Sequence, residues 1–109
     1  MVEPMAAVSA RYETAQLHFA MGDYITAAQE LEPIAEAVPE DVSVRLLLAR
    51  SYYHSAQLHR AEAEASAVLA SDPANAYAYL LLGRTLERQS RHAEAGGPLR
   101  MAAAMGVDR

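Results

Sequence analysis

The stretch SDPANAYAYLLLGRTL, residues 71–86, has a counterpart 34 residues earlier in AVPEDVSVRLLLARSY, residues 37–52. Both stretches carry a proline near their start, and the step between Pro39 and Pro73 is 73 − 39 = 34 residues. Proline lacks a backbone donor and tends to end a helix, so each stretch is expected to hold one helix end and the next helix start. A fixed period of this length indicates a stack of similar helical units.

Small residues recur at the same step in two sets. The sets are Ala15, Ala49 and Gly83, and Ala27, Ala61 and Ala95. Because a side chain at a packed helix contact must fit its neighbours closely, these positions predict pairs of helices whose backbones approach one another. Three segments, 8–41, 42–75 and 76–109, then account for nearly the whole chain, which we interpret as a single domain.

The segment YLLLGRTL, residues 79–86, carries Tyr79, Leu82, Gly83 and Leu86 at the positions of a W-x-x-L-G-x-x-Y pattern. The corresponding residues of the second segment are Arg45, Leu48, Ala49 and Tyr52, and GDYITAA at 22–28 supplies a turn and helix start in the first. On these residues the chain resembles the tetratricopeptide repeat family. The resemblance implies an all-α fold, a right-handed superhelix of three antiparallel helix pairs.

The pattern predicts helices at 6–21, 24–38, 41–55, 58–70, 75–89 and 92–105, with Asp41 and Asn75 as N-caps. Two of these helices contain proline. We expect a bend at Pro33 and a break at Gly96, Gly97 and Pro98.

The first helix fits the repeat least well. Arg11, Thr14 and His18 occupy positions that should be apolar, so we expect this helix to be rotated relative to the others.

Composition excludes several classes of function. The chain has no Cys, which removes disulfides and thiolate catalysis, and its net charge of −5 disfavours nucleic-acid binding. No apolar run approaches the roughly 20 residues that cross a membrane, and the first residues do not resemble a secretory signal. Its basic residues are all Arg, which with the many Ala residues suggests a bacterial protein, and we expect a cytoplasmic one.

Catalysis finds no support in the sequence. His18, His54, His59 and His92 lack a neighbouring nucleophile pattern or metal-ligand spacing, and no phosphate-binding loop is present. We therefore predict no enzyme activity, no metal and no cofactor.

In the tetratricopeptide family the first helices of the pairs line a concave face. The resemblance therefore implies a peptide-binding surface made of residues spaced by the repeat: Tyr12, Gln16, Phe19, Leu46, Arg50, Tyr53, His54, Tyr77, Leu80, Arg84 and Arg88. Guanidinium groups suit carboxylates because their forked donors match two acceptor oxygens. The positions of the family's dicarboxylate clamp hold other residues here, so no clamp of that kind is expected.

Two alternatives stay open within this surface. Arg50 and Arg84 either contact a ligand or are ordinary solvated charges, with Arg84 able to pair with Glu87. Tyr12 and Phe19 either face the groove or belong to the core.

The sequence thus predicts a protein–protein interaction module, an adaptor or scaffold that binds a protein or peptide, including acidic ones, on its concave face. The alternative is a self-associating assembly module that uses Leu99, Ala102 and Met105 at the C-terminal end. Both a monomer and a homodimer are compatible with the sequence.

Overall fold

The computed structural model describes residues 5–108, and side chains from Ala7 onward. It contains six α-helices: α1 (Met5–Ala20), α2 (Tyr24–Ala37), α3 (Val42–His54), α4 (Leu58–Ser71), α5 (Ala76–Arg88) and α6 (His92–Ala104). Each helix end lies within one residue of its predicted position, and the described residues contain no strand. The all-α fold class predicted from the sequence is confirmed. The repeat boundaries at residues 41/42 and 75/76 stay a prediction.

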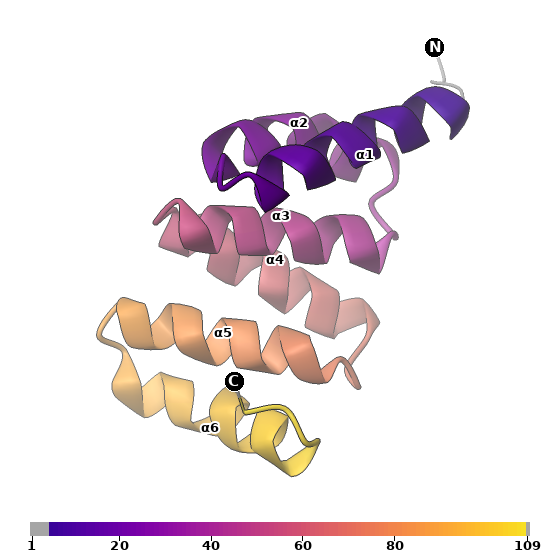
Figure 1. Ribbon diagram of the computed structural model, residues 1–109. Helices are drawn as coiled ribbons and strands as arrows, with labels where there is room; N and C mark the ends of the chain where they lie inside the picture. The colour runs from indigo at the N-terminus through magenta and orange to yellow at the C-terminus, as the bar shows by residue number, and fades with distance from the viewer. Residues whose placement is uncertain (1–4, 109) are drawn as a thin grey trace.

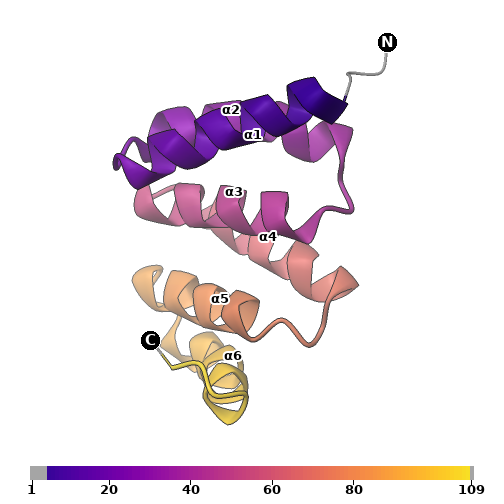
Figure 2. The same ribbon diagram turned by 45° about the vertical axis from the view of Figure 1, so that its right-hand side comes forward.

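The helices form three antiparallel pairs stacked along one axis, α1 with α2, α3 with α4 and α5 with α6 (Figure 1). The first helices of the pairs lie side by side, and α2 and α4 lie behind them, an order that persists when the molecule is turned (Figure 2). The molecule measures 43 × 25 × 21 Å. Apart from a few contacts between successive first helices, each helix touches only its neighbours along the chain, which is the packing of a solenoid.

The turn inside each pair uses the same backbone geometry. Gly22, Ala56 and Ser90, spaced by the repeat, have φ angles of 81°, 61° and 61°. At each turn two amides bond back to carbonyls of the ending helix, as in Gly22 N to Phe19 O at 3.0 Å and Asp23 N to His18 O at 2.9 Å. This left-handed ending satisfies carbonyls that a helix leaves without partners, and it reverses the chain direction.

The next helices begin with side-chain caps. Asp41 accepts a hydrogen bond from Val44 N at 3.2 Å, and Asn75 accepts one from Ala78 N at 2.9 Å. Both predicted N-caps are confirmed, and each lies two residues after a proline, Pro39 or Pro73.

The small residues of the repeat lie in the helix contacts. Ala15, Ala49, Ala27 and Ala61 are completely buried. At Gly83 an added Cβ would lie 2.5 Å from Cγ of Leu99, so α5 and α6 approach too closely for any larger residue.

The predicted rotation of α1 is wrong. Ala15 is buried just as Ala49 is, so α1 keeps the register of α3. Leu48 and Tyr52, the apolar residues of α3 that correspond to Thr14 and His18, are buried on the side where α3 meets the preceding helix α2. The same side of α1 has no such neighbour, because no helix among the described residues precedes α1. The polar Thr14 is therefore exposed without penalty.

The predicted break in the last helix is also wrong. Helix α6 runs from His92 to Ala104 through both glycines and Pro98, with Ala95 and Ala102 buried along its inner side. Packing against α5 outweighs the poor helix propensity of these residues, which tertiary contacts often do. Helix α2 runs through Pro33 to Ala37, and the bend expected at Pro33 stays a prediction.

Candidate functional site

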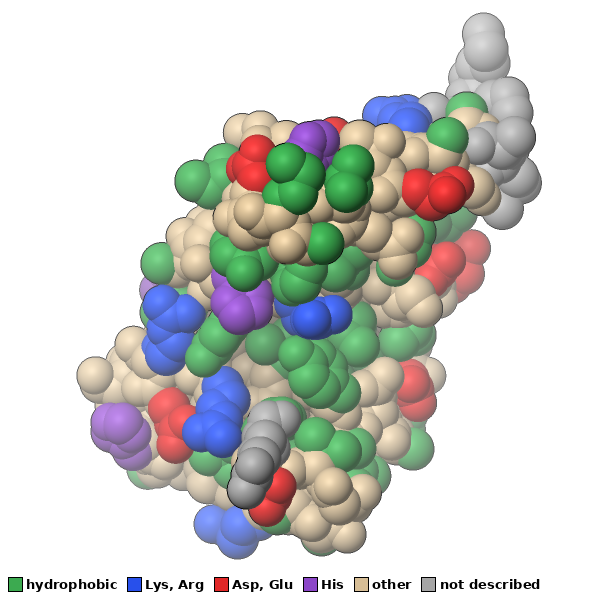
Figure 3. Space-filling model, viewed as in Figure 1, with side chains coloured by type: hydrophobic (Ala, Val, Ile, Leu, Met, Phe, Trp, Pro, Cys, Tyr) green, Lys and Arg blue, Asp and Glu red, His purple; other side chains and the backbone are tan. Residues whose placement is uncertain are grey.

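The face formed by α1, α3 and α5, here called the first-helix face, gathers cationic and aromatic side chains at its middle. Figure 3 shows Arg and His side chains there, surrounded by hydrophobic ones. The predicted site residues come together on this face because they sit one repeat apart on helices that lie side by side. The acidic residues of α4 are engaged elsewhere, with Glu64 paired to Arg45 at 2.9 Å and Glu62 paired to Arg91 at 2.6 Å.

Arg50 links all three helix pairs. Its guanidinium carbon lies 4.6 Å from the ring centre of Phe19 on α1 and 5.6 Å from that of Tyr77 on α5. Its Nε is buried and has no hydrogen-bond partner. Aromatic faces attract cations but do not accept N–H groups as well as oxygen does, so this guanidinium is held in place while part of its donor capacity is unused.

An aromatic cluster surrounds His54 beside Arg50. The imidazole stacks on Tyr24, with centroids 4.6 Å apart, and meets the rings of Tyr53 and Phe19 edge-on at 5.4 and 5.7 Å. Burial, and then the charges of Arg50 and Arg88, hold the pKa of His54 below its ordinary value. His54 is therefore biased toward the neutral form, which does not repel the neighbouring guanidinium groups.

Tyr24 is a residue that the sequence analysis missed. Tyr24 is the first residue of α2, the second helix of its pair, whereas the predicted peptide-binding residues all lie on the first helices of the pairs. The turn at Gly22 brings Tyr24 back onto Phe19, with ring centroids 5.1 Å apart.

Arg88 is fixed at the edge of the same cluster. Its guanidinium carbon lies 4.7 Å from the Tyr53 ring centre, and its Nη1 donates to the Tyr53 carbonyl oxygen at 2.7 Å. This contact joins α5 to the end of α3.

Arg84 has polar partners of its own. Its Nη1 lies 3.5 Å from a carboxylate oxygen of Glu87, so the ion pair weighed in the sequence analysis is present. Its Nη2 donates to the main-chain carbonyl of Asp108 at 3.3 Å. The guanidinium thus already engages a peptide group of a segment that folds back from α6.

Two cavities open beside the first helices. The cavity between α3 and α5 has a volume of about 200 Å³ and is lined by Tyr53, His54, Tyr77, Leu80, Leu81 and Arg84. The cavity at the junction of α1, α2 and α3 has a volume of about 160 Å³ and is lined by Val8, Ser9, Tyr12, Ile34, Val38, Asp41, Ser43 and Val44. Burial, with the nearby charge of Asp41, raises the pKa of Tyr12, so its phenol stays neutral.

The remaining predicted residues fall into different environments. Tyr12 and Phe19 are half-buried and pack against the core, so each is partly a core residue and partly a residue of the first-helix face. Leu80 is 4% exposed and forms a cavity wall. Leu46 is half-buried and Gln16 exposed, and neither lines one of the two cavities described above.

The candidate self-association residues need correction. Ala102 is completely buried, and Leu99 packs on Gly83 inside the last helix pair. Of the three predicted residues, only Met105 is accessible for self-association, with 40% of its surface exposed. Met101, which was not among them, is 45% exposed. Ala102 occupies the same position in its repeat as Ile34 and Val68. Residues at this position pack within their own helix pair and not against a following pair.

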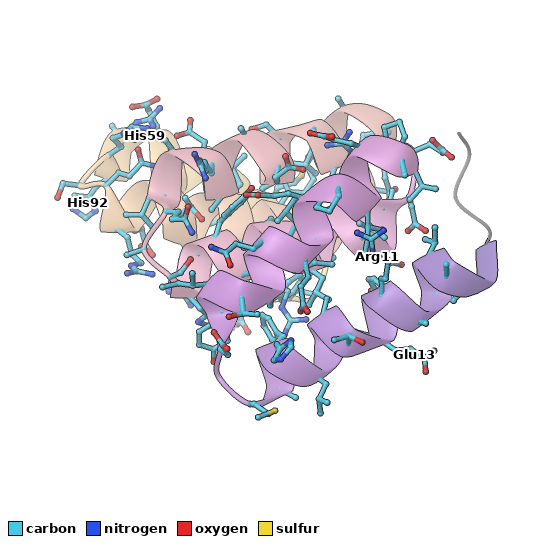
Figure 4. All side chains as sticks on the ribbon, turned by 90° about the horizontal axis from the view of Figure 1, so that it is seen from above. Arg11, Glu13, His59 and His92 are labelled. Carbon is cyan, nitrogen blue, oxygen red and sulfur yellow. The ribbon has the colours of Figure 1, made fainter. Side chains whose placement is uncertain are left out.

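Other chemistry finds little support among the described residues. No three His, Asp or Glu side chains within 5–108 are grouped to hold a metal ion. His59 and His92 lie at one end of the molecule, and Arg11 and Glu13 toward the other (Figure 4). No helix in the described part of the chain combines the length and apolar character of a membrane span.

Known proteins resemble this chain in sequence and in fold. The tetratricopeptide repeat family matches residues 18–84. A sequence comparison with curated proteins gave no match.

Three solved structures illustrate the similarity of fold. The Yersinia enterocolitica type III secretion chaperone SycD, in complex with a peptide of the translocator YopD, has a TM-score of 0.87 at 17% identity, covering 95% of this chain and 79% of that one. The first TPR of Spaghetti (RPAP3), bound to the HSP90 peptide SRMEEVD, has a TM-score of 0.86 at 16% identity, covering 97% and 84%. MamA from Desulfovibrio magneticus RS-1 has a TM-score of 0.83 at 22% identity, covering 89% of this chain and only 55% of the MamA chain.

Proposed function

The chain belongs to the tetratricopeptide repeat family, and we propose that it is a protein-interaction module whose first-helix face is a concave surface that binds an acidic segment of a partner protein. The observation that carries the proposal is Arg50, a cation held in place between aromatic rings of two other helices. Recognition, and no covalent chemistry, is the mechanism.

The charge balance of the first-helix face favours an acidic ligand. Arg50, Arg84 and Arg88 lie on it, and Glu87 is engaged by Arg84. Since the whole chain carries a net charge of −5, a local excess of cations on one face would select acidic segments against the general repulsion.

The contact between Arg84 and the Asp108 carbonyl supports the same proposal. A main-chain segment crossing this face already receives a hydrogen bond from the guanidinium. A partner peptide in that place would offer both carbonyls and carboxylates, and charge-assisted bonds to carboxylates are the stronger kind.

Similar structures add support from their ligands. SycD was solved with a YopD peptide and Spaghetti with an HSP90 peptide, so helical stacks of this shape hold peptides. For this chain we propose an adaptor role in the bacterial cytoplasm, without catalytic activity.

The test is a pull-down from an extract of the source organism with three forms of the protein. They are the wild type, an Arg50→Glu and Arg84→Glu double variant, and an Arg60→Glu and Arg100→Glu double variant. The last makes the same charge change on exposed residues away from the first-helix face. Circular dichroism and thermal unfolding establish that all three fold equally.

We expect one partner that the wild type and the control variant retain and the Arg50 and Arg84 variant loses. Equal capture by all three forms would remove the first-helix face as the binding surface. If no form captures a partner and light scattering finds a dimer, self-association through the region of Met101 and Met105 replaces the proposal.

A further inference from the structure

A groove runs between the second helices α2 and α4, with residues of α3 as its floor. Its larger hollow has a volume of about 430 Å³, and its lining includes Glu32, Glu36, Arg45, Tyr52, Arg60 and Glu64. A second hollow of about 390 Å³ continues the groove toward Ile25, and the two hollows share Glu32 and Arg60. Because α2 and α4 lie behind the first helices (Figure 1, Figure 2), this groove is separate from the first-helix face.

The larger hollow carries three carboxylates and only two guanidinium groups. Arg45 is fully engaged, since its Nη1 pairs with Glu64 at 2.9 Å and its Nε donates to the Pro39 carbonyl at 2.5 Å. Glu36 is exposed, and no cation among the described residues lies within ion-pair distance of it. Glu32 and Glu36 are four residues apart on one helix, a spacing at which like charges repel. The groove is therefore short of one cation.

Arg60 shows which kind of cation suits this place. The Tyr52 hydroxyl donates to Glu32 at 2.5 Å, and the guanidinium carbon of Arg60 lies 5.8 Å from the Tyr52 ring centre. Arg60 Nη1 is 3.7 Å from Glu32, longer than a hydrogen bond, and donates instead to Gln57 at 3.1 Å. With its side chain 65% exposed and its ring distance close to the limit of about 6 Å, Arg60 holds this position only loosely.

The next junction of the stack shows that these groups are not needed for folding. Helix α4 packs on α5 as α2 packs on α3. One repeat after Glu32, Glu36, Arg45, Tyr52, Arg60 and Glu64, however, the chain has Ser66, Ala70, Tyr79, Leu86, Glu94 and Pro98. The repeat therefore forms without a pair of carboxylates on its second helix, and the repulsion between Glu32 and Glu36 calls for another reason.

From these observations we propose that the groove between α2 and α4 is a second binding surface, which takes an arginine side chain from a basic segment of a partner protein. The incoming guanidinium replaces Arg60 over the Tyr52 ring and bonds to the carboxylates of Glu32 and Glu36. Arginine suits this place better than lysine, because a planar guanidinium can stack on a ring while its forked donors reach two carboxylates. The surface is independent of the first-helix face, so either one can fail without the other.

The experiment is a titration of the isotope-labelled full chain with a blocked tripeptide, Ala-Arg-Ala, followed by two-dimensional NMR. Amide signals near Glu36 and Tyr52 report binding in the groove, and those near Arg50 report binding on the first-helix face. Two further tripeptides replace the arginine by citrulline, which has nearly the same shape without the charge, and by lysine.

Three variants test the groups that line the groove. Glu36→Ala, alone and combined with Glu32→Ser, introduces the residues of the next junction, and Glu13→Ala, exposed on α1, is the control for the lost charge. Arg60→Gln removes the loosely held guanidinium. Its control is Arg100→Gln, which makes the same charge change at an exposed position on α6. Thermal unfolding checks that each variant is folded, and Glu36→Ala should not lower the Tm because it removes a repulsion.

We expect saturable shifts around the groove with a Kd in the millimolar range for the arginine tripeptide, weaker binding of the lysine one and none of the citrulline one. Glu36→Ala should weaken binding about threefold and the double variant about tenfold, as expected for partly exposed charge pairs. Arg60→Gln should strengthen it about threefold, because the ring and Glu32 become free. Glu13→Ala and Arg100→Gln should bind as the wild type does.

Several results would overturn the proposal. The groove takes no cation if its signals stay unchanged up to the solubility limit of the tripeptide, or if the citrulline tripeptide binds equally well. Unchanged affinity in the Glu36→Ala and double variants would exclude the carboxylates as ligands. Weaker binding to Arg60→Gln would show that Arg60 does not stand in the ligand's place. The pull-down with the Arg50 and Arg84 variant decides the proposed function separately from all of these.

Discussion

At the scale of single residues, two glycines show that the space around a glycine decides whether a larger residue can replace it. Gly83 on α5 faces Leu99, and an added Cβ would lie 2.5 Å from the Cγ and Cδ2 of that side chain and 3.3 Å from its backbone nitrogen. Gly97 on α6 has nothing within 4 Å of an added Cβ. Both lie inside helices, where alanine has the higher intrinsic propensity.

We expect Gly83→Ala to lower the free energy of unfolding by about 1–3 kcal/mol, because relieving the clash requires α5 and α6 to separate. Gly97→Ala should raise it by about 0.5–1 kcal/mol, because alanine loses less backbone entropy on folding. Urea denaturation followed by circular dichroism measures both. A stabilised Gly83→Ala variant would mean that α6 can shift on α5 at little cost.

Arg50 could be predicted as a site residue from the sequence, but its contacts with aromatic rings could not. The repeat spacing placed it on the first-helix face, but its neighbours, Phe19 and Tyr77, lie 31 and 27 residues away along the chain. Only the stacking of three helix pairs brings two rings to one guanidinium.

At the scale of helices, α6 forms despite its sequence. Two glycines and a proline in its interior each disfavour the helix, yet it runs unbroken to Ala104. Its stability therefore comes from packing on α5 and not from local preference.

Pro98→Ala is expected to raise the free energy of unfolding by about 1–3 kcal/mol, because alanine restores the donor for the i−4 hydrogen bond and removes the ring's clash. Thermal unfolding would register the change as a higher Tm. Pro33→Ala in α2 is the companion variant, since Pro33 is also inside a helix but is exposed. A lower Tm for Pro98→Ala, with Pro33→Ala raised, would show that the half-buried ring of Pro98 contributes packing that outweighs the lost bond.

At the scale of the whole molecule, the two ends of the stack differ from its middle. The pair α3 and α4 has a neighbour on both sides, whereas α1 with α2 and α5 with α6 each have one among the described residues. In a solenoid, stability is close to a sum of unit and interface contributions, so end units open more easily.

Amide hydrogen exchange should therefore be slowest in the buried centres of α3 and α4, around Leu48 and Ala65, and faster in α6. Mass spectrometry of fragments after timed exchange in heavy water would resolve the three pairs. Uniform protection across all six helices would instead indicate that the chain unfolds only as a whole. Protection of α6 that rises with protein concentration would point to self-association at that end.

The sequence by itself determined the family, the six helices and nearly all of their ends, because proline, the capping residues and small contact residues recur at one fixed step. Those signals are local or periodic and do not depend on what packs where. It also selected the residues of the first-helix face.

The tertiary structure alone decided four matters: the register of α1, the continuity of α6, the burial of Ala102 and the joining of Tyr24 to His54. Each depends on which side of a helix meets another element, and contacts between helices can outweigh the preferences of individual residues. The two cavities beside the first helices arise in the same way, from side chains of separate helices that only stacking brings together.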